Sequence, residues 1–197
     1  MLNDFFDKPW IPVGVWVLFY TSDYYSTIAA ARLCSAGKHF EFSEGYELNP
    51  YFADEVASLR WFSSKFVWIL FLYAGWLLIS YFLASFVDSK ELFGLTWGFL
   101  ILLQLAIHVR HARNLLLFYY AKRSSGIQGR IDVAHWLSLR QSAVELISFG
   151  LMFLFIFLIT QSPPLAGGAI SCVMVGVKHV VTSVKRRKTQ VQPPSAE

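Results

Sequence analysis

The sequence has 197 residues, of which 55% are hydrophobic and only 15% are charged, and its formal net charge is +4 at pH 7. An ordinary soluble domain has about 25% charged residues, and a soluble fold of this length could not bury so many apolar side chains. These values exclude a soluble globular protein, whereas a bilayer could cover the apolar surface. The length suggests a single domain.

The first apolar segment runs from Trp10 to Ala31 and has the length of a membrane-crossing helix, which takes about 20 residues. Its polar stretch, Thr21 to Thr27, contains Asp23. The segment is either a first span whose polar stretch faces the protein interior or an interfacial segment packed on the bundle. Its length favours the span. The acidic start of the chain and Asp23 argue against a cleaved signal peptide.

An acidic and aromatic connector follows the first segment and ends at Pro50, a residue that suits a helix start. We expect the second helix to begin near Tyr51. Asn49 would then cap this helix. In the alternative interpretation, Glu47 or Asn49 covers a functional site from the cytoplasmic side. The order of Asn before Pro favours the helix cap.

Later segments are long, apolar and nearly free of charge, and lipid offers no hydrogen-bond partner to a backbone that is not helical. The sequence therefore predicts an all-α, polytopic membrane helical bundle. We expect five transmembrane helices, four at minimum, near residues 10–31, 66–87, 92–113, 143–161 and 165–184.

Some of these helices should extend beyond the lipid on the cytoplasmic side. The third is expected to reach about Tyr120, residues 124–129 form a turn, and the fourth begins near Ile131. Residues 1–188 should form one bundle. Residues 189–197 are expected to be a disordered tail, because this segment is polar and contains prolines.

Lysine and arginine residues are distributed unevenly between the two sides of the predicted bundle. With five spans, one side carries Lys8 and Lys90, and the turn at residues 161–164 adds no charge. The other side receives the remaining basic residues of the loops, including those from Lys185 to Lys188. Because basic loops favour the cytoplasm, we expect the C-terminus inside and the N-terminus outside. If residues 10–31 do not cross, only the N-terminus changes side.

Five ionisable side chains fall at one depth of the predicted spans. Such residues are costly in lipid and usually face the protein interior. With a rise of about 1.5 Å per residue, the candidates at the level of the inner leaflet are Asp23, His108, His111, Glu145 and His179. They belong to four helices, and equal depth is a necessary condition for a shared site.

Helical periodicity adds the directions of some of these side chains. Gln104, His108 and His111 share one face of the third span. Arg110 points away from that face and could reach lipid phosphates.

In the last span, small residues recur every four positions at Gly168, Cys172 and Gly176, which is typical of a helix-packing face. His179 continues this stripe, so it should point at a neighbouring helix.

The cluster has the side chains of a metal site or an acid–base site. Imidazole and carboxylate groups suit zinc or another divalent metal, and His108 and His111 are spaced to reach one ion. The same groups could exchange or relay protons. In the alternative interpretation they only join helices or meet headgroups. A haem between His108 and His179 fits their depth, but nothing else in the sequence supports it.

Two classes of function remain. The sequence favours a small subunit or scaffold of a larger membrane complex, whose partners are the lipid bilayer and other membrane proteins. The alternative is a membrane-embedded metal-dependent enzyme, or an ion or proton pathway, that uses the inner-leaflet cluster. No catalytic signature decides whether the chain is an enzyme. Topology and anionic lipid explain the basic face, so we do not expect nucleic-acid binding.

Overall fold

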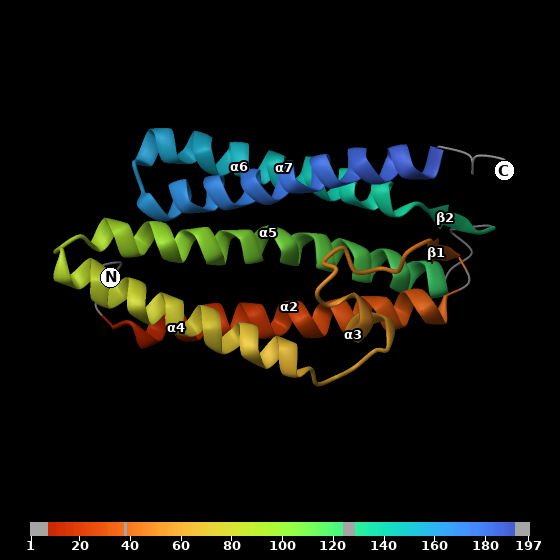
Figure 1. The fold of residues 1–197 in the computed structure, drawn as a ribbon, viewed down its shortest axis with the longest axis horizontal. Helices are drawn as coiled ribbons and strands as arrows, with labels where there is room; N and C mark the ends of the chain where they lie inside the picture. The colour runs from red at the N-terminus through yellow and green to blue at the C-terminus, as the bar shows by residue number, and fades with distance from the viewer. Residues whose placement is uncertain (1–7, 38, 124–128, 192–197) are drawn as a thin grey trace.

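The computed structural model describes residues 8–37, 39–123 and 129–191, and most of them are helical. Its helices and strands, in chain order, are α2 (Trp10–Ala36), β1 (Phe40–Phe42), α3 (Ala53–Ala57), α4 (Ser64–Phe86), α5 (Lys90–Arg123), β2 (Ile131–Val133), α6 (His135–Thr160) and α7 (Pro163–Val191) (Figure 1). The structure confirms the predicted all-α helical bundle.

Four of the described helices are long and apolar enough to cross a membrane, namely Ser64–Phe86, Lys90–Arg123, His135–Thr160 and Pro163–Thr189. In their most apolar windows, only 17%, 28%, 22% and 33% of the residues are buried inside the protein. The remaining apolar surface faces outward, and soluble monomers rarely expose contiguous patches larger than a few hundred Å². The chain is therefore a multi-pass integral membrane protein.

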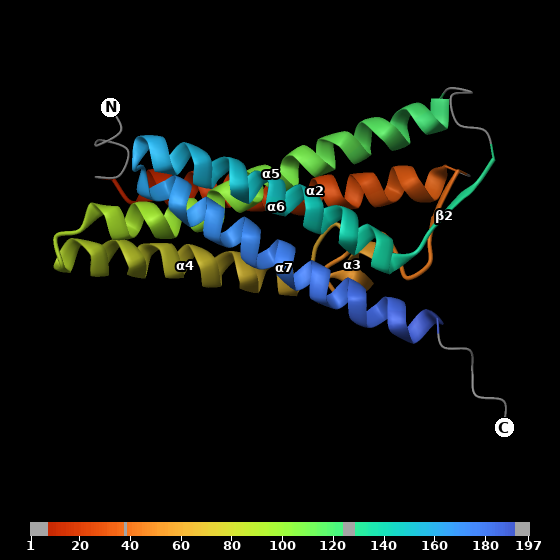
Figure 2. The same cartoon turned by 90° about the horizontal axis from the view of Figure 1, so that it is seen from above.

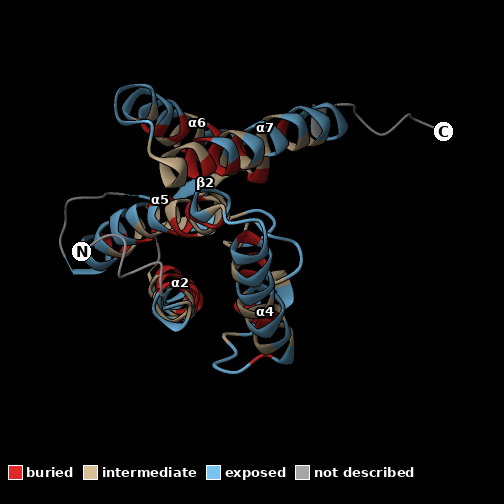
Figure 3. Cartoon of the chain, turned by 90° about the vertical axis from the view of Figure 1, so that its left-hand side faces the viewer, coloured by how far each residue is buried: buried red, intermediate tan, exposed pale blue. Residues whose placement is uncertain are grey.

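The long helix α5 lies at the centre of the bundle. Seen from one end, α2 and α4 pack on one side of α5, and the hairpin of α6 and α7 packs on the other (Figure 3). Helix α7 lies directly against α5 (Figure 1). Toward the end that carries β1 and β2, α5 diverges from α6 and α7 (Figure 2). The connector between α2 and α4 lies at this end, which we call the polar end because of the side chains described below.

The first helix, α2, has 27 residues and lies along α5 (Figure 1). Trp97 of α5 donates its Nε1 hydrogen to the backbone oxygen of Pro12, at 3.0 Å. The N-terminal end of α2 lies level with the turn between α4 and α5 (Figure 1). Helix α2 is not one of the four apolar helices named above. A fifth crossing by α2 stays a prediction.

Helix α7 packs between α5 and α6 through small residues. A Cβ atom added at Gly168 would lie 2.5 Å from Leu102 of α5, and one added at Gly176 would lie 2.7 Å from Ile147 of α6. Cys172 lies between the two glycines and is fully buried. The three small residues therefore let α7 approach two different helices closely, as interfaces in membrane proteins commonly do.

Two helix starts differ from the sequence predictions. The second long helix, α4, begins at Ser64 instead of near Tyr51, because the short α3 ends before Leu59, whose φ of 51° interrupts the helix. The hydroxyl of Ser63 accepts a hydrogen bond from the amide of Phe66 at 3.4 Å and caps α4.

The fourth predicted helix also starts later than expected. Residues Ile131–Val133 form β2, which pairs in parallel with β1, and α6 begins only at His135. Local sequence could not reveal this pairing, because β1 lies far away in the chain. Helix α7 continues to Val191, into the predicted tail. Residues 124–128 of the predicted turn and residues 192–197 of the tail lie outside the described residues.

Candidate functional site

Polar side chains from α2, α5 and α6 meet in one layer near the polar end. The Nε2 atom of His111 lies 2.7 Å from Oδ1 of Asp23 and 3.2 Å from Oγ1 of Thr27. His111 is buried. On the α6 side of α5, Arg113 forms an ion pair with Glu145. These contacts hold the three helices at one relative height.

The same layer includes α7. Arg110 Nη1 donates a hydrogen bond to Ser142 Oγ at 2.5 Å, and Nδ1 of His179 lies 3.0 Å from that oxygen. His179 therefore points at a neighbouring helix. In the structure Arg110 reaches α6, and its contact with lipid phosphates stays a prediction. Periodicity gave the direction of its Cβ, but it could not show that α6 lies within reach of the long side chain.

His108 makes contacts of its own, toward the middle of α2. Its Nε2 lies 2.5 Å from Oγ of Ser22, and its Nδ1 donates to the backbone oxygen of Gln104 at 2.7 Å. The ring also meets Phe19 edge-on, with centroids 5.1 Å apart. Both nitrogens of His108 are thus occupied by contacts that do not involve His111.

The predicted residues share one layer but fall into separate groups instead of one site. Only two of them, Asp23 and His111, contact each other directly. The residues that stay apart from this pair, each with different partners, are His108, Glu145 and His179.

The predicted metal and haem sites gain no support from this geometry. Among the described residues, no group of three or more His, Cys, Asp or Glu side chains is arranged to hold a metal ion. His108 and His111 point at different partners on α2. His108 and His179 contact different helices, α2 and α6.

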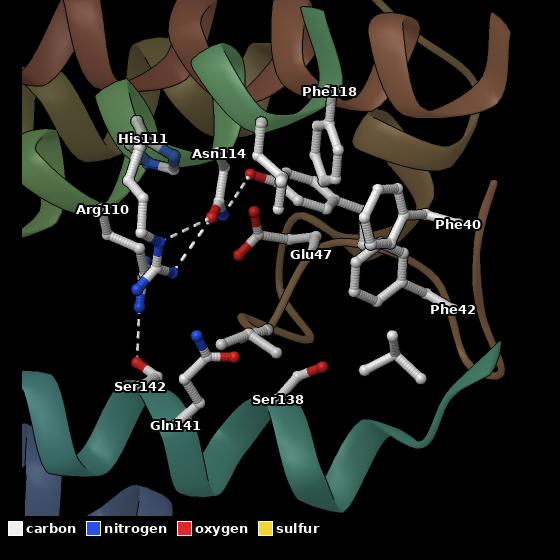
Figure 4. A pocket seen from close by; sticks show the side chains of 15 residues that line it. Phe40, Phe42, Glu47, Arg110, His111, Asn114, Phe118, Ser138, Gln141 and Ser142 are labelled. Atoms are coloured by element: carbon white, nitrogen blue, oxygen red, sulfur yellow. Dashed lines mark hydrogen bonds between the residues drawn. The ribbon is translucent and has the colours of Figure 1, made fainter. Parts of the chain in front are cut away.

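A cavity of about 140 Å³ lies where α5 and α6 diverge, and the connector closes it from the polar end (Figure 4). His111 and Arg110 line it from α5, Ser138 and Gln141 line it from α6, and Glu47 lines it from the connector. Aromatic rings near β1 cover one of its sides (Figure 4). The cavity combines charged, polar and apolar walls, as small-molecule sites do.

Several buried polar atoms at this cavity have no hydrogen-bond partner within the described part of the chain. They include Nδ1 of His111, Oγ of Ser138 and Oε2 of Glu145. His111 and Ser138 line the cavity, and Glu145 pairs with Arg113, which also lines it. Buried polar groups in folded proteins are nearly always satisfied. The protein alone therefore leaves the polar wall around this cavity incompletely paired.

The two connector residues singled out from the sequence have different positions. Oδ1 of Asn49 accepts a hydrogen bond from the amide of Tyr51 at 3.1 Å, so Asn49 forms a local turn just before α3. Oε1 of Glu47 accepts from the amide of Asn49 at 2.7 Å, and Glu47 lines the cavity. Asn49 is thus a turn residue, whereas Glu47 faces the candidate site from the polar end.

The protonation of Glu47 is shifted by its surroundings. Burial raises the pKa of the Glu47 carboxyl, against the opposing effects of the Asn49 amide and of Arg110, while the nearby charge of Asp23 raises it further. The neutral acid is therefore favoured more than in water. A neutral Glu47 can donate a hydrogen bond into the cavity.

Sequence reasoning missed the α6 wall of the cavity. Ser138, Gln141 and Ser142 are spaced three and four residues apart, so they share one helix face. This spacing was the one sequence feature that indicated a polar face on α6. Serine and glutamine are common at such positions, and only the divergence of α5 and α6 gives this face a cavity to line.

The polar layer does not continue across the bundle. Above His108, Gln104 is buried on α5, but the next α5 residues in the core, Ile101 and Phe93, are apolar. Trp16 fills the facing part of α2. Among the described residues this arrangement argues against a complete proton pathway along the interface of α2 and α5.

Comparisons with protein-family models, with curated proteins and with solved structures give no match for this chain. Its function is therefore inferred from its own residues.

Proposed function

We propose that this multi-pass membrane protein has a ligand-binding, acid–base site at the cytoplasmic end of its bundle. The observation that carries the proposal is Nδ1 of His111, which is buried without a partner beside the cavity while Asp23 holds Nε2. A carboxylate that orients one nitrogen of an imidazole prepares the ring for acid–base chemistry, and His111 is one of the residues around the cavity.

The cytoplasmic assignment of the polar end comes from its basic residues. Arg123 ends α5 at this end, Arg140 lies in the first turns of α6, and Lys185 lies in the last turns of α7. Lys90, at the opposite end, begins α5. An excess of Lys and Arg favours the cytoplasmic side. This supports a cytoplasmic C-terminus and, if α2 crosses, an N-terminus on the other side.

A compound bound in the cavity should co-purify with the protein and be lost when the cavity is filled. Ser138→Leu adds bulk to a wall without removing a hydrogen bond, because its hydroxyl has no partner. We expect mass spectrometry of the denatured, purified protein to reveal a compound released from the wild type and depleted at least about tenfold in Ser138→Leu.

Ser85→Leu, at the far end of α4, is the matched control and should retain the compound. Ser85 is exposed and does not line this cavity, and its hydroxyl donates a hydrogen bond to the backbone oxygen of Tyr81 within its own helix. Equal release from both variants, or no release from the wild type, would contradict a ligand site in the cavity.

A second candidate is the subunit or scaffold role favoured by the sequence. The observation that favours it is the broad exposed aromatic face of α4, where Trp68, Trp76 and Phe82 are 75%, 52% and 65% exposed. Such a face suits packing against another membrane protein as well as lipid. A partner should then co-purify in mild detergent, and recovery of the chain only as a monomer would count against this role.

A further inference from the structure

Two arginine side chains line the cavity, and only one of them has a carboxylate partner among the described residues. Arg113 lines it but is paired with Glu145. For Arg110, the hydrogen bond to Ser142 is the one polar contact found among the described residues. A guanidinium has five N–H donors, so Arg110 keeps donors available for another group.

The carboxyl group of Glu47 does not cancel this charge. Arg110 and Glu47 line the same cavity, but no ion pair joins them among the described residues (Figure 4). Burial, which raises the pKa of Glu47, favours its neutral form. Ser138 and Gln141 point into the space from α6 (Figure 4). The polar part of the cavity therefore offers Arg110, which has no paired carboxylate among the described residues, and several hydrogen-bond donors.

Another part of the cavity is largely apolar, and its rim includes exposed residues. Phe40, Phe42 and Phe118 form one wall. On the rim, Leu117 of α5 and Gln141 of α6 are exposed. This rim lies among the basic residues of the polar end, at the depth where lipid headgroups meet the helices if that end is cytoplasmic.

We infer that this cavity binds the phosphate group of an anionic amphiphile, with Arg110 as its main contact and the apolar rim beside the first part of the tail. The inference rests on the proposed function and names the ligand class of the same site. Guanidinium groups match phosphate oxygens in shape and charge. A free phosphate would use the same donors but would leave the apolar wall without a role.

The test measures retention of a phospholipid. The protein is reconstituted in nanodiscs of phosphatidylcholine with a minor fraction of phosphatidic acid, extracted in mild detergent and analysed by mass spectrometry. We expect near-stoichiometric retention of phosphatidic acid by the wild type and at least about tenfold less in Arg110→Gln, because a charge-assisted contact is lost. Ser138→Leu fills the cavity without removing a hydrogen bond and should show the same loss of phosphatidic acid. This second variant keeps the test decisive if Arg110→Gln folds poorly.

Arg140→Gln is the matched control, because Arg140 is exposed on α6 near the same end but does not line the cavity. It should retain phosphatidic acid as the wild type does. Equal losses in Arg110→Gln and Arg140→Gln would indicate unspecific attraction to basic residues and would overturn the inference. Failure of the wild type to retain phosphatidic acid would overturn it as well. Unchanged retention in Ser138→Leu would place the lipid elsewhere and overturn it too.

A parallel arm uses inorganic phosphate in neutral nanodiscs of phosphatidylcholine. Inorganic phosphate could stabilise the protein against heat as strongly as phosphatidic acid does. That result would assign the site to a free phosphate and overturn the inference that the ligand is an amphiphile. If Ser138→Leu instead loses a co-purified compound without phosphate, the proposed ligand site stands and this inference fails. The two failures are thereby distinguishable.

Discussion

Replacing Gly98 with alanine should destabilise the bundle by about 3 kcal/mol, near the upper end of the usual cost of overpacking. A Cβ atom at residue 98 would lie 2.1 Å from the backbone oxygen of Pro164 and 2.4 Å from its Cα. Backbone atoms cannot rotate away as a side chain can, so α5 and α7 would have to separate. The loss should appear as a lower midpoint of thermal unfolding in one fixed detergent.

Gly75→Ala is the matched control for this substitution. Gly75 lies within α4, and nothing stands within 4 Å of a Cβ atom added there. Alanine has a higher helix propensity than glycine by about 1 kcal/mol, so this variant should be as stable as the wild type or slightly more stable. A loss of the same size in both variants would show that the close contact of α5 and α7 is not the cause.

Replacing Asp23 with alanine should cost about 2 kcal/mol of stability. Interhelical hydrogen bonds in membrane proteins contribute about 0.6 kcal/mol on average, whereas leaving one member of a buried charged pair alone costs about 3–5 kcal/mol. The stability lost with the contact between Asp23 and the buried His111 should lie between these values, because the Asp23 side chain is 20% exposed. Thr27, at 3.2 Å, would remain as a weaker partner for His111.

A double-mutant cycle separates this contact from general damage to α2. Asp23→Ala and His111→Ala together should cost less than the sum of the two single variants, since each removes the same interaction. Ser26→Ala, which loses only a hydrogen bond within α2, should change stability by no more than about 0.5 kcal/mol. Additive costs in the cycle would contradict a direct Asp23–His111 interaction in solution.

The spans were predictable because lipid imposes a length and a composition on each helix. The uncharged stretch from Phe66 to Val87 corresponds to α4, and the charge-free turn near Gln161 separates α6 from α7. The small residues at Gly168 and Gly176 also lie at close helix contacts. These features depend on local sequence, so a single chain was enough to find them.

The cavity and the connector were not predictable in this way, because they depend on contacts between distant segments. β1 pairs with β2 across about ninety residues, as the bond between His39 and Gly129 illustrates. This pairing delays the start of α6 to His135. Depth placed Asp23 and His111 at one level, but depth alone could not show that His108 faces Ser22 instead of joining them.

The most direct test of the account is the accessibility of two engineered cysteines in cell-derived vesicles. Gln141→Cys lies on the rim of the cavity, and Ser162→Cys lies in the turn between α6 and α7 at the opposite end. Both native cysteines, Cys34 and Cys172, are buried and should react little. A membrane-impermeant thiol reagent should label Gln141→Cys only in inside-out vesicles and Ser162→Cys only in right-side-out vesicles. Labelling of both positions from the same side would contradict a membrane-spanning bundle with its polar cavity at the cytoplasmic face.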